Sequence, residues 1–338
     1  MKRLSILFAI LIALGGIAYY LNSNSTDGKS SISGEDRNFA FPRDQIGKLT
    51  VQKVGEKMQT FSLRKGGHWY LDDTYKVSQF TMPYLLQSVS DLTIQNIPAK
   101  NATQNILNDI ERVGIKVKIY DLDGKEVRSY RVGLESNDDK GTYFLMDGSK
   151  QPYNMYVKGF DGTMRTRFFQ PIDKWRDREI WQYDPNEITE IGVKYHKSQK
   201  ESFKLVVTET GIAVSPLSQF ISPSDKDVDQ DKARAYLSVF TRIYAEDYDN
   251  ENIRKDSIST LIPFATIAVK DKSGHINEVD FYPFRDLLLK NVNTKDLEEA
   301  KKIERFFIKH SKGDFMVAQK RQVKEVFRPY DFFLKEDA

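Results

Sequence analysis

The sequence predicts an α+β protein: an N-terminal transmembrane helix followed by a tandem duplication of one unit of antiparallel sheet and helix. Three observations lead to this prediction. Short runs with alternating apolar residues, typical of half-buried strands, are separated by single amphipathic helices. The same order of strands, helix and hairpin occurs twice along the chain. A length of 338 residues suits about two domains, at roughly 150 residues each.

The composition is that of an ordinary globular protein, with 40% apolar and 29% charged residues. The 51 basic and 48 acidic residues leave a net charge of +3, which gives no support for a nucleic-acid partner. Cysteine is absent. This excludes disulfide frameworks, thiol catalysis, zinc sites of the Cys type and lipid attachment through an N-terminal Cys.

Residues 1–21 are the first predicted element, a transmembrane anchor or signal peptide. Lys2 and Arg3 precede an uncharged run from Leu4 to Leu21. As a helix this run spans roughly 27 Å, close to the hydrocarbon core of about 30 Å. The two positive charges favour a cytoplasmic N-terminus. We therefore expect a single-pass protein of the bacterial inner membrane whose C-terminal body lies in the periplasm or otherwise outside the cytoplasmic membrane.

Cleavage of this segment is the alternative. Ser23 and Ser25 have the small-residue spacing of a cleavage site, although the apolar run is longer than the usual signal-peptide core of about 7–15 residues. The sequence leaves retention and cleavage open. Residues 22–38 are rich in Ser, Asn and Gly without an apolar pattern, which predicts a flexible linker.

The first α+β unit is predicted over residues 39–182. Apolar spacings of three and four indicate its helices, and Asp123-Gly124 between alternating strands indicates a hairpin turn. The expected elements are strands at 46–54, 61–63 and 68–71, helices at 77–92 and 103–113, strands at 117–122, 127–132, 142–146 and 153–157, and a helical stretch ending near residue 169.

The second unit is predicted over residues 183–338, with the division near Trp181–Asp184. Leu49 recurs as Ile191, and Gly124 recurs as Gly274, at similar separations. The expected elements are strands at 188–195 and 203–207, a helix at 233–243, hairpin strands at 267–269 and 279–281, and an extra helix at about 296–309.

Templates for catalysis and cofactor binding do not fit the sequence. The residues at 28–30 resemble the end of a phosphate-binding loop, but Ser23 stands where its first glycine is required. The residues at 121–124 resemble part of a calcium loop, but Val132 replaces its terminal glutamate. The four histidines lie far apart in sequence. We expect no catalytic residue, no cofactor, no metal site and no enzyme activity.

Two clusters rich in aromatic and basic residues are the candidate interaction or interdomain surface. One surrounds Trp69, and the other alternates Trp and Arg with Asp. Arg can stack on aromatic rings and pair with carboxylates, which would lock the two units together. Trp and Arg also dominate binding hot spots, so the same residues could form a partner surface. The candidates are Trp69, Arg167, Phe168, Trp175, Arg176, Arg178 and Trp181.

These clusters and several turns resemble the DUF4340 family of uncharacterised bacterial proteins. The resemblance lies in residues 67–71, 115–132, 141–144, 159–162, 167–169 and 175–178. It implies a membrane-anchored, exported protein that often accompanies a permease and an auxiliary subunit of ABC transporters of the gliding-motility type. The family has no catalytic residues to carry over.

We therefore expect a non-enzymatic accessory or scaffold subunit of a bacterial cell-envelope complex, associated with a gliding-type ABC transporter. Its partners would be the membrane, through the N-terminal helix, and a permease or auxiliary subunit. The alternative is an extracytoplasmic ligand-binding module for glycan or an exported polypeptide, because the chain contains 12% aromatic residues.

Overall fold

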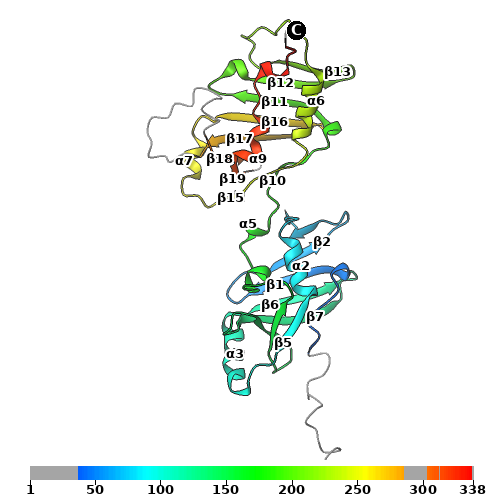
Figure 1. Cartoon of the computed structure of the whole chain (residues 1–338), viewed down its shortest axis with the longest axis vertical. Coiled ribbons are helices and arrows are strands. Elements are labelled where there is room, and N and C mark those ends of the chain that lie inside the picture. Colours follow the sequence, from blue (N-terminus) through cyan, green and yellow to red (C-terminus); the bar gives the residue numbers. More distant parts are fainter. Residues whose placement is uncertain (1–36, 285–302, 312, 337–338) are drawn as a thin grey trace, which may run out of the picture. The chain divides into compact units, whose positions relative to one another are not determined.

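The computed structural model describes residues 37–284, 303–311 and 313–336 (Figure 1). Two compact units divide the chain between Gln170 and Pro171. The predicted anchor at 1–21 and nearly all of the predicted linker at 22–38 lie outside the described residues. Within the described ranges, no helix has the length and hydropathy needed to cross a membrane.

The described part of unit 1 forms a nine-stranded antiparallel sheet with the order β4-β3-β2-β1-β6-β7-β8-β9-β5. Its strands are β1 (Ile46–Lys53), β2 (Gln59–Leu63), β3 (Trp69–Leu71), β4 (Tyr75–Lys76), β5 (Leu92–Asn96), β6 (Ile115–Asp121), β7 (Glu126–Glu135), β8 (Thr142–Met146) and β9 (Tyr153–Val157). Its α-helices are α2 (Met82–Ser90), α3 (Lys100–Val113) and α4 (Arg165–Phe168).

Unit 1 buries side chains on both faces of this sheet because successive strand residues point to opposite sides. On one face, Phe39, Phe144 and Phe168 form edge-to-face ring contacts with centroids about 6 Å apart. On the other face, Ile106 and Ile110 of α3 pack against Leu145 of β8. The sheet therefore separates an aromatic core from a smaller aliphatic cluster.

The described part of unit 2 forms an eight-stranded antiparallel sheet with the order β13-β12-β11-β16-β17-β18-β19-β15. Its strands are β11 (Ile188–Tyr195), β12 (Phe203–Thr208), β13 (Gly211–Pro216), β15 (Asp247–Tyr248), β16 (Ala265–Asp271), β17 (Ile276–Pro283), β18 (Arg305–His310) and β19 (Phe315–Gln319). A separate strand pair joins β10 (Glu179–Trp181) to β14 (Ile243–Tyr244). The α-helices are α5 (Ile172–Trp175), α6 (Gln230–Val239), α7 (Lys255–Ser259) and α9 (Lys320–Val323).

The two sheets share one strand topology. Placing β1 on β11 and β6 on β16 makes each strand of the second sheet coincide with one of the first, with β5 on β15. Only β4 has no counterpart among the described strands of the second sheet. The registers agree: Ile46 pairs with Asp121 and Ile188 pairs with Asp271, each followed by a shift in register. The hairpin turns agree as well. In each, the aspartate side chain accepts backbone hydrogen bonds, and Gly124 and Gly274 have φ angles of 82° and 84°.

Several predicted elements are confirmed, including β8, β9 and the β6–β7 hairpin. The extra helix predicted at 296–309 is wrong over its described residues from Arg305 onward. Arg305–His310 is strand β18, paired with β17 and β19, and residues 296–302 lie outside the described part. The neighbouring apolar residues Phe306, Phe307 and Ile308 fit a strand that is buried on both faces. The prediction read them as one face of a helix.

The units divide after Gln170, whereas the sequence placed the division between 182 and 183. Residues 171–182 therefore belong to unit 2. Trp175, Ile180 and Trp181 are all fully buried. This stretch is therefore part of the second unit rather than a connection placed outside it.

The outer edges of the sheets differ in how they end. In unit 1, β4 is only two residues long. In unit 2, the side-chain amide of Gln230 donates to the Ile212 carbonyl and accepts from the Ile212 N–H of β13, both at 2.9 Å. The amide makes the two hydrogen bonds that a further strand would make at this point, so it caps the β13 edge.

Candidate functional site

Three of the predicted surface residues are core side chains. Phe168, Trp175 and Trp181 have no exposed surface. The Trp181 ring contacts Phe240 edge-to-face, with centroids 5.2 Å apart. These three residues cannot form a recognition surface in the folded protein, so Trp175 and Trp181 cannot line a ligand groove.

Trp69 lies elsewhere, half-buried in strand β3 of unit 1, opposite Leu63 of β2. Its position in a short strand near the sheet edge explains its partial exposure. Arg167 lies in the same unit, but its ring and hydrogen-bond partners are Phe160, Tyr84 and Gln87 rather than Trp69.

Arg167 lies between two aromatic rings of unit 1. Its guanidinium carbon is 3.6 Å from the centroid of the Phe160 ring and 5.2 Å from that of Tyr84. Its Nη1 donates a 3.1 Å hydrogen bond to Oε1 of Gln87. Burial lowers the pKa of Arg167, which the nearby Tyr84 partly offsets. The side chain stays cationic because an arginine pKa lies far above neutral pH.

This arginine adjoins exposed surface. Tyr84 is 56% exposed, and Phe80, in the turn just before the same helix, is 54% exposed. A groove of about 480 Å³ shares Tyr84 and Gln87 with the Arg167 site, and is lined by Pro42, Arg43, Pro83, Tyr84, Gln87, Ser90 and Asp91. We call Phe80, Tyr84, Phe160 and Arg167 the aromatic–arginine surface.

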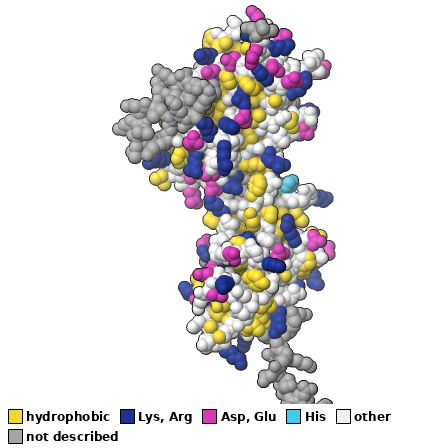
Figure 2. All heavy atoms as spheres, viewed as in Figure 1, with side chains coloured by type: hydrophobic (Ala, Val, Ile, Leu, Met, Phe, Trp, Pro, Cys, Tyr) yellow, Lys and Arg dark blue, Asp and Glu magenta, His cyan; other side chains and the backbone are white. Residues whose placement is uncertain are grey.

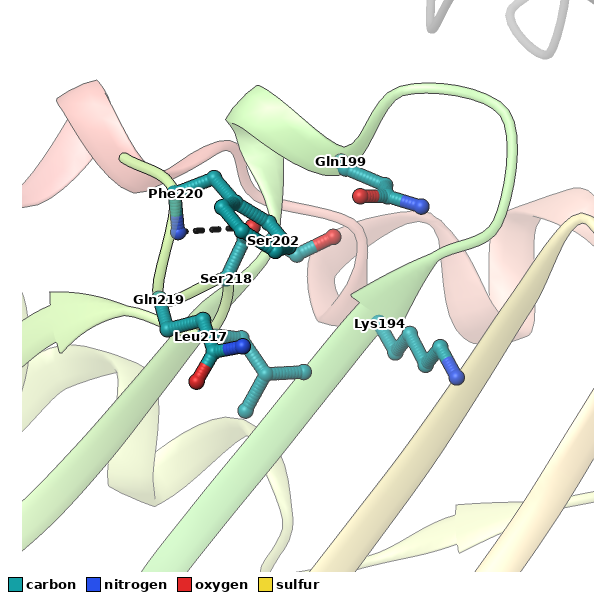
Figure 3. A pocket seen from close by; sticks show the side chains of 7 residues that line it. All are labelled: Lys194, Gln199, Ser202, Leu217, Ser218, Gln219 and Phe220. Carbon is teal, nitrogen blue, oxygen red and sulfur yellow. Dashed lines mark hydrogen bonds between the residues drawn. The ribbon is translucent and has the colours of Figure 1, made fainter.

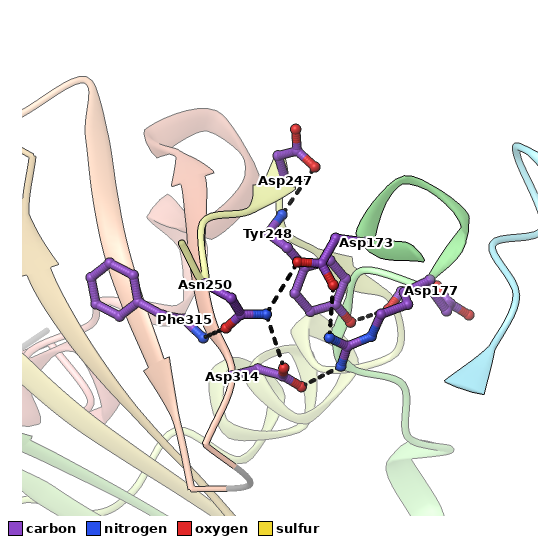
Figure 4. A network of polar contacts seen from close by, with 8 residues as sticks. Asp173, Asp177, Asp247, Tyr248, Asn250, Asp314 and Phe315 are labelled. Atoms are coloured by element: carbon purple, nitrogen blue, oxygen red, sulfur yellow. Dashed lines mark hydrogen bonds and ion pairs between the residues drawn. The ribbon is translucent and has the colours of Figure 1, made fainter. Parts of the chain in front are cut away.

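Arg176 has a different setting, because its partners Asp173, Tyr248 and Asp314 belong to unit 2 (Figure 4). Its guanidinium donates to Asp314 at 2.7 Å and to Asp173 at 3.0 Å, and stacks 4.1 Å from the centroid of the Tyr248 ring. Burial lowers the pKa of Arg176, but the hydrogen bond to Asp314 and the other acidic partners outweigh it, and the pKa is raised.

Asn250 completes this network. Its amide nitrogen donates to both Asp173 and Asp314 at 3.4 Å, and its oxygen accepts from the Phe315 N–H at 2.8 Å (Figure 4). Both carboxylates are therefore held by Arg176 and Asn250 together. Within residues 37–284, 303–311 and 313–336, no group of three or more His, Asp or Glu side chains is arranged to hold a metal ion.

Arg178 and its neighbours fasten the chain before β10 to the edge of the second sheet. Arg178 donates through Nη1 to the Glu246 carbonyl, and its own carbonyl accepts from the Ala245 N–H at 2.8 Å. The Tyr248 hydroxyl donates to the Asp177 carbonyl at 2.6 Å, and Lys174 pairs with Asp247. The predicted Trp–Arg cluster is thus a seam inside unit 2, made of buried tryptophans and paired arginines.

A second groove lies in unit 2, with a volume of about 330 Å³ (Figure 3). Its apolar rim is formed by Phe220, which is 87% exposed, and by Leu217, which is 39% exposed. The Lys194 ammonium and the Gln199 amide supply polar groups. The lining residues are Lys194, Gln199, Ser202, Leu217, Ser218, Gln219 and Phe220.

The exposed side chains Phe80, Tyr84 and Phe220 were not among the sequence candidates. Phe80 and Tyr84 were assigned to the buried face of a helix because their spacing fits the apolar pattern of 77–92. The helix begins only at Met82 and buries Leu85, Leu86 and Val89. Pro83 near its start, which cannot lie deeper in a helix, was the signal that could have moved Phe80 outside.

A family model matches the middle of the chain. A model of the family described as "Domain of unknown function (DUF4340)" matches residues 69–258, more than half of the sequence. The chain belongs to the DUF4340 family. The DUF4340 match begins at β3 and ends in α7, so it takes in most of the first sheet and the start of the second. No curated protein and no solved structure matches the chain.

Proposed function

We propose that this DUF4340 protein is a non-enzymatic accessory or scaffold subunit of a bacterial cell-envelope complex, associated with a gliding-type ABC transporter. The observation that carries the proposal is the aromatic–arginine surface of unit 1, with its groove. Tyr84 and Arg167 are residue types that dominate protein–protein contacts. Here Tyr84 of α2 is 56% exposed, and the half-buried Arg167 of α4 lies beside its ring.

The surface chemistry of the remaining molecule fits a protein partner better than a nucleic acid. Figure 2 shows basic and acidic side chains interspersed over the face in view. The net charge of the chain is only +3. Mixed charge with a local aromatic patch is typical of a surface that binds one protein partner and otherwise remains solvated.

The cellular setting of the proposal comes from the sequence. Residues 1–21 would anchor the chain in the inner membrane or direct its export, and the body after residue 38 would lie outside the cytoplasmic membrane. The partners would be the permease or the auxiliary extracytoplasmic subunit of the transporter. The proposal includes the origin of the two units by tandem duplication, which the shared strand order and the matching turns support.

The proposal is tested by affinity capture of the full chain from detergent-solubilised membranes, followed by crosslinking and mass spectrometry. We expect a permease, ATPase or auxiliary subunit to be recovered, and Tyr84→Ala to reduce that recovery. Phe220→Ala, which removes an even more exposed aromatic ring in unit 2, is the control and should leave recovery unchanged. Recovery of the chain alone, under conditions that preserve other membrane complexes, contradicts the proposal.

The second candidate function is a ligand-binding module for glycan or an exported polypeptide. The groove beside Phe220 favours it, because an exposed aromatic ring next to Lys194 and Gln199 offers one apolar face and two polar contacts (Figure 3). Phe220→Ala should then abolish binding of cell-wall oligosaccharides or peptides measured by calorimetry, while Tyr84→Ala should not. The two functions are thus separated by opposite responses to the same pair of variants.

A further inference from the structure

Arg167 has no carboxylate partner among the described residues, although it is half-buried between two aromatic rings. Within the same residues, its side chain makes one hydrogen bond, from Nη1 to Oε1 of Gln87. Burial lowers the pKa of Arg167, and the group that opposes this shift is Tyr84 rather than an Asp or Glu. Removing a cation from water without a counter-charge is costly. Arg167 is therefore an unmatched positive charge at this surface.

Three other arginines that stack on aromatic rings do have acidic partners. The pairs are Arg176 with Asp173 and Asp314, Arg64 with Asp73, and Arg328 with Glu325. In these places a carboxylate completes the contacts of a ring-stacked arginine. Arg167 has the rings and an amide, and lacks only the carboxylate.

A second ring-stacked arginine without a carboxylate lies near the same groove. The guanidinium carbon of Arg128 is 5.6 Å from the centroid of the Phe41 ring. Its Nη1 donates to a backbone carbonyl at 2.6 Å, and its Nε is buried without a hydrogen bond. The N–H of Phe41 donates to the Val89 carbonyl of α2, and Pro42, the next residue, lines the groove. The groove wall thus has a further unmatched cation behind it.

The groove itself contains another arginine. Arg43 lines it and forms no ion pair within the described residues, although Asp44 is the next residue along the chain. Asp91 also lines the groove, and its Oδ1 accepts from the Ser90 hydroxyl at 2.7 Å. The arginines around the groove outnumber these two carboxylates, so the surroundings favour an anionic occupant.

The groove follows one face of a helix. Tyr84, Gln87 and Ser90 line it at spacings of three residues, so they lie in a row along α2. The row is roughly 9 Å long at about 1.5 Å per residue, which matches about three residues of an extended chain. Pro42 and Pro83 supply apolar walls. This shape suits a short stretch of extended polypeptide.

The amide of Gln87 adds a directed donor to the groove. Arginine can only donate hydrogen bonds, so the bond from Arg167 fixes the amide with Oε1 toward the guanidinium. Nε2 makes no hydrogen bond within the described residues. It is therefore available to a backbone carbonyl of an occupant.

We propose that this groove binds an extended segment of a protein partner, and that Arg167 receives an Asp or Glu side chain of that segment. The proposal deepens the accessory function proposed above and rests on it. Nε and Nη2 of Arg167 make no hydrogen bond within the described residues, and together they form the planar fork that a carboxylate accepts. Tyr84 packs on an apolar neighbour of the acid, and Gln87 donates to the backbone.

A polypeptide fits this site better than a lipid surface. A groove with Pro and Tyr walls makes contacts along a chain, whereas lipid is approached by protruding apolar side chains with basic residues around them. Asp91 would repel a layer of anionic headgroups. For a peptide it only disfavours a second acidic residue at that end of the groove.

The first experiment selects peptides from a random display library on the full chain, purified in detergent. We expect the enriched peptides to contain an Asp or Glu beside Pro or another apolar residue. The strongest should bind the unaltered chain about tenfold to a hundredfold more tightly than its counterpart with Asn or Gln in place of the acid, measured by fluorescence anisotropy. No enrichment, enrichment of peptides without an acid, or equal binding of the two counterparts overturns the proposal.

The second experiment assigns the carboxylate to Arg167. Arg167→Gln should reduce binding of the acidic peptide to that of its neutral counterpart, and Arg167→Lys should restore part of it. Arg64→Gln is the matched control, because it removes a ring-stacked arginine of the same unit that already pairs with Asp73, and it should leave binding unchanged. Binding that Arg167→Gln leaves intact overturns the proposal. So does tighter binding of inorganic phosphate than of every selected peptide, which would indicate a phosphate-bearing ligand.

These results are separable from those for the accessory function. Capture of a transporter subunit that depends on Tyr84, without any dependence of acidic peptides on Arg167, overturns the carboxylate and leaves the accessory function standing. Acidic peptides that bind through Arg167, with the chain recovered alone from membranes, support the carboxylate and contradict the accessory function.

Discussion

Units 1 and 2 share a strand order but close their sheets differently. The edge formed by β14 and β15 is covered by residues 171–181 through backbone pairing, the Arg176 network and an ion pair. The equivalent strand in unit 1, β5, pairs with β9, and the chain before Arg37 lies outside the described residues. The comparison shows that, in unit 2, the stretch that precedes the first strand of the sheet is itself part of the packed unit.

The largest expected loss of stability follows from replacing Trp181, which is buried in unit 2 at the β10–β14 strand pair. Trp181→Ala removes a fully buried ring from contact with Phe240 and Phe281, and should cost about 3–5 kcal/mol of the free energy of unfolding of unit 2. Trp69→Ala, at a half-buried site, should cost far less. Urea unfolding with hydrogen exchange resolved by unit measures both, and equal losses contradict the core placement of Trp181.

Arg176→Met tests the network that fastens the closed edge. The substitution leaves Asp173 and Asp314 without their shared cation, and should destabilise unit 2 by about 2–3 kcal/mol. Arg176→Lys keeps the charge but loses the stacking on Tyr248 and one of the two forked contacts, so it should recover only part of the loss. Thermal unfolding measures both variants, and full recovery by lysine would show that charge alone matters.

The hairpin glycines test whether the two units are equivalent where they look alike. Gly124→Ala and Gly274→Ala each force a side chain into a left-handed conformation, with no neighbouring atom within 4 Å of the new Cβ. Each should cost about 1–2 kcal/mol, by the same conformational cause. Paired denaturation curves measure the two losses. A difference larger than about 1 kcal/mol would mean that the turns are not equivalent.

The smallest expected effect is a pH dependence of the stability of unit 2 that comes from His196. Burial and then Lys194 lower the pKa of His196, partly offset by Asp280, while its Nε2 bonds to the Thr266 hydroxyl at 2.8 Å. Because the folded pKa is below the unfolded value of about 6.5, protonation favours the unfolded state. Stability should therefore fall as the pH drops through about 6.5, weakly, since the ring is half-exposed. His196→Gln should flatten unfolding free energies measured between pH 7.5 and 5.

Much of the fold follows from local patterns in the sequence. The strands 142–146 and 153–157 and the turn at Asp123-Gly124 are recognisable because alternation and turn chemistry are local. Strand β5 was missed, since Leu92 also completes a helical spacing and the following residues are polar. Strand β18 was taken for a helix because a strand buried on both faces lacks alternation.

The candidate site was harder to predict than the fold. Trp175, Arg176 and Trp181 have a composition common to binding surfaces and to internal seams. Only tertiary contacts assign them to the seam: Arg176 meets Tyr248 and Asp314, and Trp181 meets Phe240. These partners are far away in sequence, so no local pattern indicates the contacts. The exposure of Tyr84 depends likewise on where α2 begins, and the apolar spacing over residues 77–92 did not indicate that start.

The Gln230 cap has a consequence for contact between molecules. Its amide occupies both the N–H and the C=O of Ile212, so at this residue β13 offers no backbone group to a strand of another molecule. Gln230→Ala would free both groups, and aggregation through this edge should then increase.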